Sequence, residues 1–127
     1  MIEGNFGSDG ELFFEIELIT ADGLELPVEA MLDTGFTEFL AINKQDLPGL
    51  GWLFVRRRTL RTAQGEADFE IYLGKVRIDG REFEIPVYAG DEITEVLLGN
   101  QWLKSMRLIV DMPSGVLSLE AISGESG

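Results

Sequence analysis

Hydrophobic and polar residues alternate early in the chain, and this alternation predicts a β-hairpin. Residues 11–20 place apolar side chains at every second position, with glutamates between several of them, as expected of a strand with one buried face. Turn-forming residues follow in Ala21-Asp22-Gly23, and the alternation resumes over residues 24–30. The second strand runs on into Met31-Leu32-Asp33, which puts an acid directly after an apolar strand.

Turn sequences between apolar segments predict two more pairs of strands. The segments of both pairs contain β-branched residues, which favour strands. The pairs are residues 69–78 and 82–88 around Asp79-Gly80, and residues 108–110 and 116–119 around Pro113-Ser114-Gly115.

Helix is predicted only in short segments. Residues 100–106 follow Gly99 and allow two turns, and residues 43–47 allow one turn before Pro48. The chain of 127 residues has the usual size of a single domain. We therefore expect one all-β domain over residues 1–127, with fraying at about residues 1–9 and 121–127.

Composition removes several classes of chemistry. With no Cys and no His, the chain lacks disulfides, Cys nucleophiles, Ser-His-Asp triads and the ordinary zinc ligands. The acids follow no calcium-loop spacing, so neither a metal nor another cofactor is expected. A net charge of −13 repels phosphate backbones and anionic membranes, so we expect no nucleic-acid or membrane partner.

The location is expected to be cytoplasmic. The longest uncharged stretch, residues 47–55, is far shorter than the roughly 20 apolar residues that span a bilayer. The amino terminus has neither the basic segment nor the apolar run of a secretory signal.

Asp33-Thr34-Gly35 is the first candidate for a functional site. The position directly after an apolar strand is unfavourable for a solvated carboxylate. Acids that have lost their hydration are candidates for catalysis. The triplet alone is also ordinary turn chemistry, in which Thr34 caps its own turn and Gly35 supplies a permissive backbone. A second motif, Leu97-Leu98-Gly99, ends another apolar strand just before the predicted helix.

With these two motifs in this order, the chain resembles the retropepsin-like aspartic proteases, specifically small single-domain bacterial members whose active-site segment reads Asp-Thr-Gly-Phe-Thr. The resemblance covers nearly the whole chain. It implies a small closed β-barrel-like retropepsin (acid protease) fold with one short C-terminal helix.

The resemblance also implies a homodimer that hydrolyses peptides. The chain has one Asp-Thr-Gly triplet, so Asp33 of each subunit would form the catalytic dyad and activate a water, with no cofactor and no metal. By the same resemblance, Thr34 would hydrogen-bond to the opposite loop and Gly35 would offer its carbonyl to the substrate.

Phe36 departs from the retroviral pattern, in which the triplet is usually followed by Ala, and from pepsins, where a hydroxyl supports the ionised dyad. Phe36 has no hydroxyl with which to stabilise the ionised dyad. We therefore expect activity at mildly acidic to near-neutral pH. Thr37 and Asn100 stand where retroviral enzymes pair an Asp with an Arg. A neutral hydrogen bond between Thr37 and Asn100 would replace that ion pair and would brace the dimer more weakly.

The resemblance suggests a flap at residues 62–66, with Ala63, Gln64 and Gly65 near the substrate. A plain surface hairpin is the alternative for this segment. The other expected walls of the substrate pocket are Leu32, Phe36 and Val96, together with Ala63 itself.

Two other functions remain open at this level. The same fold could act as a catalytically silent dimeric peptide-binding module, or as an assembly domain that uses exposed strand edges such as residues 116–120. The arginines at 56–58 and 61 are interpreted as a solvated face or as partners of carboxylates. Trp52, Phe54 and Trp102 are interpreted as packing residues.

Overall fold

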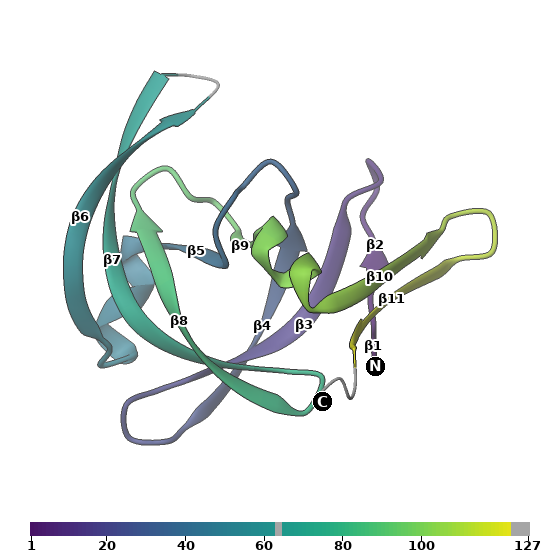
Figure 1. Ribbon diagram of the computed structural model, residues 1–127, viewed down its shortest axis with the longest axis horizontal. Helices are drawn as coiled ribbons and strands as arrows, with labels where there is room; N and C mark the ends of the chain where they lie inside the picture. The colour runs from purple at the N-terminus through teal and green to yellow at the C-terminus, as the bar shows by residue number, and fades with distance from the viewer. Residues whose placement is uncertain (63–64, 123–127) are drawn as a thin grey trace.

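A computed structural model of the chain describes residues 1–62 and 65–122 and consists mostly of strands (Figure 1). This confirms the all-β prediction. The elements in chain order are β1 (Ile2–Glu3), β2 (Asn5–Phe6), β3 (Leu12–Ile19), β4 (Glu25–Leu32), β5 (Leu40–Asn43), the 3₁₀ helix η1 (Lys44–Gly49), β6 (Leu53–Thr62), β7 (Gly65–Ile78), β8 (Arg81–Gly90), β9 (Val96–Leu98), the 3₁₀ helix η2 (Asn100–Lys104), β10 (Met106–Asp111) and β11 (Val116–Ala121).

Six of the strands close into a barrel in the order β3-β4-β9-β5-β8-β7, because β7 pairs back onto β3. The pairs β4–β9 and β5–β8 are parallel and the others are antiparallel. β6 extends the sheet beyond β7, and Figure 1 shows it at the outer rim of the molecule. The predicted closed barrel is therefore confirmed.

The three predicted hairpins correspond to β3–β4, β7–β8 and β10–β11. β11 is the central strand of a separate sheet, with β10 on one side and β1 on the other. The expected exposed edge at residues 116–120 is therefore covered in its middle, since β10 pairs with one side of β11 along its length and β1 pairs with Ser118 and Leu119 on the other. Residues 1–9, where fraying was expected, contain β1 and β2, whereas residues 123–127 lie outside the described range.

The barrel core follows the alternation seen in the sequence. Phe14, Ile16 and Leu18 of β3 are almost fully buried. Trp102 of η2 closes one side of this core, where it packs edge-on against Phe39 and Phe83. Its indole N–H donates to the carbonyl oxygen of Phe39 at 2.7 Å, which confirms that Trp102 packs the C-terminal turn onto the barrel.

Both predicted helices differ from the expectation. η2 is a 3₁₀ turn that ends at Lys104, because Met106 already belongs to β10. η1 spans Lys44–Gly49, with Asn43 as its N-cap and Pro48 inside it. Among the described residues, no helix has the length and apolar character needed to cross a membrane.

Asp79 ties the β7–β8 turn to the end of β11. Its Oδ2 accepts a hydrogen bond from the N–H of Ala121 at 3.0 Å, and its Oδ1 pairs with the N-terminal ammonium of Met1. These contacts, the Ala121 hydrogen bond first, lower the pKa of Asp79 below its ordinary value of 3.8. Asp79 also has a positive φ of 55°, which Asn tolerates as well.

We expect Asp79→Asn to lower the free energy of unfolding by about 1–2 kcal/mol at neutral pH, because it keeps the turn and removes the charge. A lowered pKa stabilises the fold above the pKa of the unfolded chain, and this stability is lost as the pH falls through the lowered value. The difference between wild type and variant should therefore shrink below pH 3.8. Urea unfolding across this range measures it, with Glu84→Gln on exposed β8 surface as the control. An equal difference at every pH would contradict the assignment.

Candidate active site

Asp33 lies where β4 ends beside β9. The parallel pairing sets Met31 opposite Leu97 and Leu32 opposite Leu98. The backbone N–H of Asp33 then donates to the carbonyl oxygen of Leu98 at 2.8 Å. The two motifs that stood far apart in the sequence are therefore neighbours in the fold.

The turn after β4 fixes one side of the Asp33 carboxylate. Asp33 Oδ1 accepts from the N–H of Gly35 at 2.9 Å, and the carbonyl oxygen of Asp33 accepts from the N–H of Phe36 at 3.0 Å. Oδ2 has no hydrogen-bond partner among the described residues. Asp33 is partly exposed, and Thr34 and Gly35 are exposed, so the free carboxylate oxygen and the Thr34 hydroxyl remain available to groups outside this chain.

The first turn of η2 braces this loop. The Asn100 side chain donates to the carbonyl oxygen of Thr34 at 3.2 Å, and the Gln101 side chain donates to that of Thr37 at 2.9 Å. The expected hydrogen bond between Thr37 and Asn100 is thus replaced by two others. Sequence reasoning missed Gln101 because nothing in the local pattern distinguishes its amide from a solvent-exposed one.

Gly99 allows the loop to approach η2 closely. A Cβ atom at this position would lie 1.8 Å from the carbonyl oxygen of Glu38 and 2.8 Å from Cδ2 of Phe36. The N–H of Gly99 donates to the carbonyl oxygen of Phe39 at 3.0 Å. Only glycine fits between the loop and η2 without displacing one of them.

An apolar cluster separate from the main core lies next to the Asp33 loop. Phe36 packs edge-on against Tyr88 of β8, with ring centroids 6.0 Å apart. The partly buried members of this cluster come from the loop, from both strands of the β6–β7 hairpin, from the segment after β8 and from β9: Phe36, Leu60, Ala67, Ile93 and Leu97.

The other expected pocket walls lie elsewhere. Leu32 is 8% exposed and belongs to the barrel core, against which Val96 also packs. This placement does not support Leu32 as the wall of an open pocket. Val96, in contrast, borders a hollow of about 390 Å³ that Asp33 does not line. Ala63 and Gln64 lie outside the described residues, and Gly65 begins β7.

By sequence, neither a protein-family model nor a curated protein matches the chain. Solved structures do match it. A retropepsin-like aspartic protease from Rickettsia conorii aligns with a TM-score of 0.62 at 22% identity, over 96% of this chain and 92% of the other. EIAV protease, solved in complex with the inhibitor HBY-793, aligns with a TM-score of 0.61 at 14% identity, over 79% and 91% of the two chains. Simian foamy virus (mac) protease aligns with a TM-score of 0.50 at 22% identity, over 71% and 92%.

The chain has the retropepsin fold. This confirms, at the level of fold, the resemblance inferred from the motifs at residues 33–35 and 97–99. The retropepsin barrel of one chain carries a single Asp-Thr-Gly loop.

In this retropepsin fold, Arg58 connects the β6–β7 hairpin to the Asp33 loop. Its Nη1 donates to the Tyr88 hydroxyl at 2.7 Å and lies 3.4 Å from a carboxylate oxygen of Glu38. The hydrogen bond to Tyr88 is the main contribution that raises the pKa of Arg58. Tyr88 in turn contacts Phe36, so the hairpin and the loop share one set of contacts. The sequence left two interpretations of this arginine, a solvated face or a partner of carboxylates, and the ion pair with Glu38 agrees with the second.

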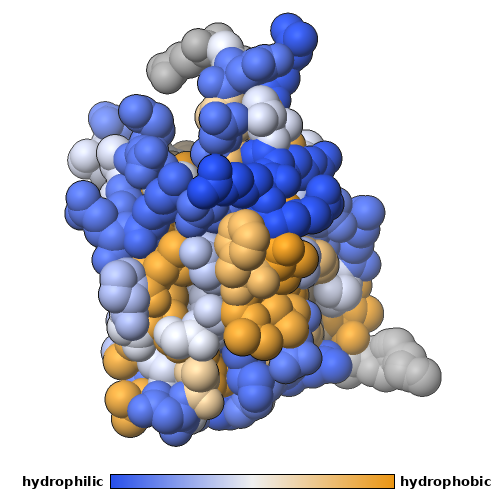
Figure 2. All heavy atoms as spheres, turned by 90° about the vertical axis from the view of Figure 1, so that its left-hand side faces the viewer, coloured by the Kyte–Doolittle hydropathy of each residue, from blue (hydrophilic) through white to orange (hydrophobic). Residues whose placement is uncertain are grey.

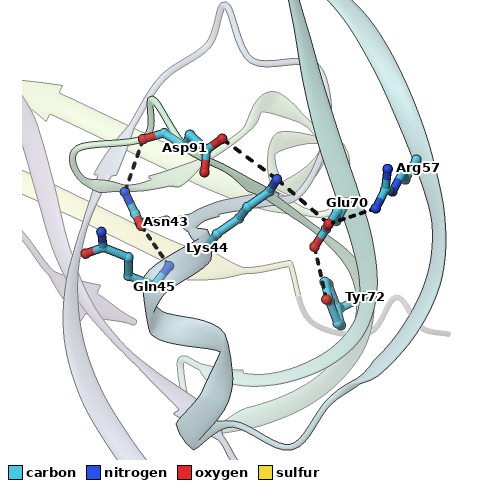
Figure 3. A network of polar contacts seen from close by, with 7 residues as sticks. All are labelled: Asn43, Lys44, Gln45, Arg57, Glu70, Tyr72 and Asp91. Carbon is cyan, nitrogen blue, oxygen red and sulfur yellow. Dashed lines mark hydrogen bonds and ion pairs between the residues drawn. The ribbon is translucent and has the colours of Figure 1, made fainter.

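A second network braces the base of the hairpin (Figure 3). Lys44 lies 3.8 Å from both Glu70 and Asp91, and Glu70 also accepts from the Tyr72 hydroxyl at 3.1 Å. Burial, and then the neighbouring Glu70, raise the pKa of Tyr72, which keeps its hydroxyl protonated as a donor. The positive charge of Lys44 thus compensates part of the negative charge of Glu70 and Asp91.

Lys44, Glu70 and Asp91 border a hollow of about 600 Å³ between the hairpin and residues 90–92. Asp33 does not line it. No group of three or more acids among the described residues is arranged to hold a metal ion.

Proposed function

We propose that the protein is a homodimeric aspartic endopeptidase in which Asp33 of each subunit forms the catalytic dyad. The observation that carries the proposal is the Asp33 loop. The retropepsin barrel holds this carboxylate at a strand end and fixes its Oδ1, while its Oδ2 has no partner among the residues that the structure describes. The similarity in fold to aspartic proteases supports the same function.

A second copy of the chain completes this site. Two carboxylates at contact distance cannot both ionise cheaply, so they share one proton and titrate as a pair. One chain supplies one such aspartate. The exposed Thr34 and Gly35 leave the loop accessible to a second copy.

The reaction then needs only water and the two carboxylates. The ionised carboxylate takes a proton from the water as the water oxygen attacks the peptide carbonyl carbon, and the protonated carboxyl polarises the carbonyl oxygen. The tetrahedral intermediate collapses when the leaving nitrogen receives a proton and the C–N bond breaks. In this dimer, Thr34 holds the two loops in register through the opposite backbone, and Gly35 offers its carbonyl to the extended substrate.

The substrate is proposed to be an extended peptide with apolar side chains on either side of the cut bond. The partly buried cluster around Phe36 and Leu97 lies beside the loop and gives such a side chain a place to bind. The β6–β7 hairpin is proposed to act as the flap that covers the substrate and excludes water.

The test is cleavage of a diverse peptide mixture, read by mass spectrometry from acidic to neutral pH, with the oligomeric state measured in the same buffers. Cuts made by the wild-type dimer and blocked by a peptide with a hydroxyl in place of the scissile carbonyl would support the proposal, since such groups mimic the tetrahedral intermediate. A folded dimer that binds peptides without cutting them would instead support a catalytically silent binding module.

Phe36→Ala is expected to enlarge the proposed pocket. Relative kcat/KM should shift about tenfold or more towards peptides with bulkier apolar side chains near the cut bond. Phe54→Ala is the matched control. The interpretation of Phe54 as a packing residue is wrong, because it is 53% exposed near the start of β6, at the opposite end of the strand from Leu60 of the Phe36 cluster. Competition between paired substrates measures the shift. An unchanged preference in Phe36→Ala would remove Phe36 from the pocket.

A further inference from the structure

We propose that the outer edge of β6 is a docking site for an extended peptide whose side chains alternate between acidic and apolar. The site does not depend on the proposed proteolytic function. β6 is the last strand of its sheet, and among the described residues only β7 pairs with it. Its other edge therefore offers backbone N–H and C=O groups to a further strand.

The side chains of β6 are exposed along nearly the whole strand. Leu53, Phe54 and Val55 are 72%, 53% and 54% exposed, and Leu73, which lies opposite Leu53 on β7, is 43% exposed. Figure 2 faces this side of the molecule and shows an apolar patch next to a hydrophilic band. An apolar patch of this kind with a polar border is typical of a surface that binds a partner.

The pairing with β7 shows which kind of strand β6 accepts. One face of the pair sets acids of β7 against β6, in the pairs Arg57–Glu70, Thr59–Asp68 and Arg61–Glu66. The other face sets apolar residues of β7 against β6, in the pairs Arg56–Ile71, Arg58–Phe69 and Leu60–Ala67. Residues 66–71 of β7 thus alternate strictly between acidic and apolar. A strand on the open edge would lie beside the same β6 side chains, so the same alternation would stabilise it.

Two contacts show that side chains of β6 do interact with the acids opposite them on β7. Arg57 Nη2 lies 3.7 Å from Glu70 Oε2, and the Thr59 hydroxyl donates to Asp68 Oδ1 at 2.7 Å. The Arg57 side chain is still 80% exposed, and neither Arg56 nor Arg61 forms an ion pair within the described part of the chain. These arginines therefore have capacity left for a carboxylate on the other side of β6.

Charge also selects against a second copy of β6 as the occupant. Four of the ten basic residues of the chain lie on this one strand, although the net charge of the chain is −13. Pairing of β6 with β6 would set arginines beside arginines, and like charges on adjacent strands destabilise the pair. An acidic strand meets attraction at the same positions.

The experiment uses a capped synthetic peptide with the sequence of residues 66–72, added to the isotope-labelled 127-residue protein. The protein carries Asp33→Asn so that it does not hydrolyse the probe. NMR shift changes and slower amide exchange are expected along residues 53–61, with smaller shift changes in the Asp33 loop, which contacts β6 through Arg58. Changes confined to the Asp33 loop, or no binding at millimolar peptide, would overturn the proposal.

Three controls separate strand pairing from general attraction. A peptide with lysine at the acidic positions should bind at least about tenfold more weakly, and the double variant Arg57→Glu, Arg61→Glu should reverse this preference. Of two peptides N-methylated at alternate positions, one should lose binding and the other keep it, because a paired strand uses only one of its edges. Equal binding of both N-methylated forms would show that no strand pairing takes place and would overturn the proposal. If a single-stranded oligonucleotide displaced the acidic peptide equally well, β6 would be a general anion site, which would overturn it too.

Discussion

Replacing Asp33 with asparagine is expected to lower kcat for peptide cleavage about 10²–10⁴-fold, the usual contribution of acid–base catalysis. Asparagine keeps the shape of the side chain, and its amide oxygen can still accept the hydrogen bond that Gly35 gives at 2.9 Å. It cannot take a proton from water. The fold should therefore survive while the activity is lost, which circular dichroism and a peptide-cleavage assay on the same sample would measure.

Mixing the two proteins tests whether the site needs both subunits. If one Asp33 from each chain forms the dyad, an excess of Asp33→Asn subunits should capture wild-type subunits in inactive mixed dimers. The activity per wild-type subunit should then fall as the variant is added. Activity that stays proportional to the wild-type protein would mean that one chain is catalytically complete, and the dimeric mechanism would be wrong.

Gly99→Ala is expected to cost about 3 kcal/mol of folding free energy, at the upper end of overpacking penalties. The new Cβ would lie 1.8 Å from the carbonyl oxygen of Glu38, and this oxygen belongs to backbone that cannot swing away like a side chain. Relief requires the loop to move away from η2. The move would strain the hydrogen bonds from Asn100 and Gln101 that brace the loop. Urea unfolding would measure the loss.

Gly49→Ala is the matched control for this change. Gly49 lies in η1, where an added Cβ would meet no atom within 4 Å and the backbone is not in the left-handed region. The same substitution there should leave stability within about 0.5 kcal/mol of wild type. Similar losses in both variants would mean that the close approach at Gly99 is not what makes glycine necessary.

Most of the strands could be predicted from the sequence, because their signal is local. Alternation within one strand reports which face is buried, and an Asp-Gly pair reports a turn, so the β3–β4 and β7–β8 hairpins needed no distant information. β6 gave no such signal. It lies beyond the closed barrel with both faces largely exposed, so its arginines and apolar residues follow no period of two.

The candidate site divides in the same way. The sequence by itself determined that Asp33 follows an apolar strand, that Gly99 ends another, and that no Cys or His is present for other chemistry. Only the tertiary structure decided that these strands pair in parallel, that Gln101 braces the loop and that β1 covers the middle of the second edge of β11. Burial and turns depend on neighbours in the chain, whereas these contacts join residues far apart in it. The way in which the barrel closes decides which residues meet, and the local composition of the sequence does not show it.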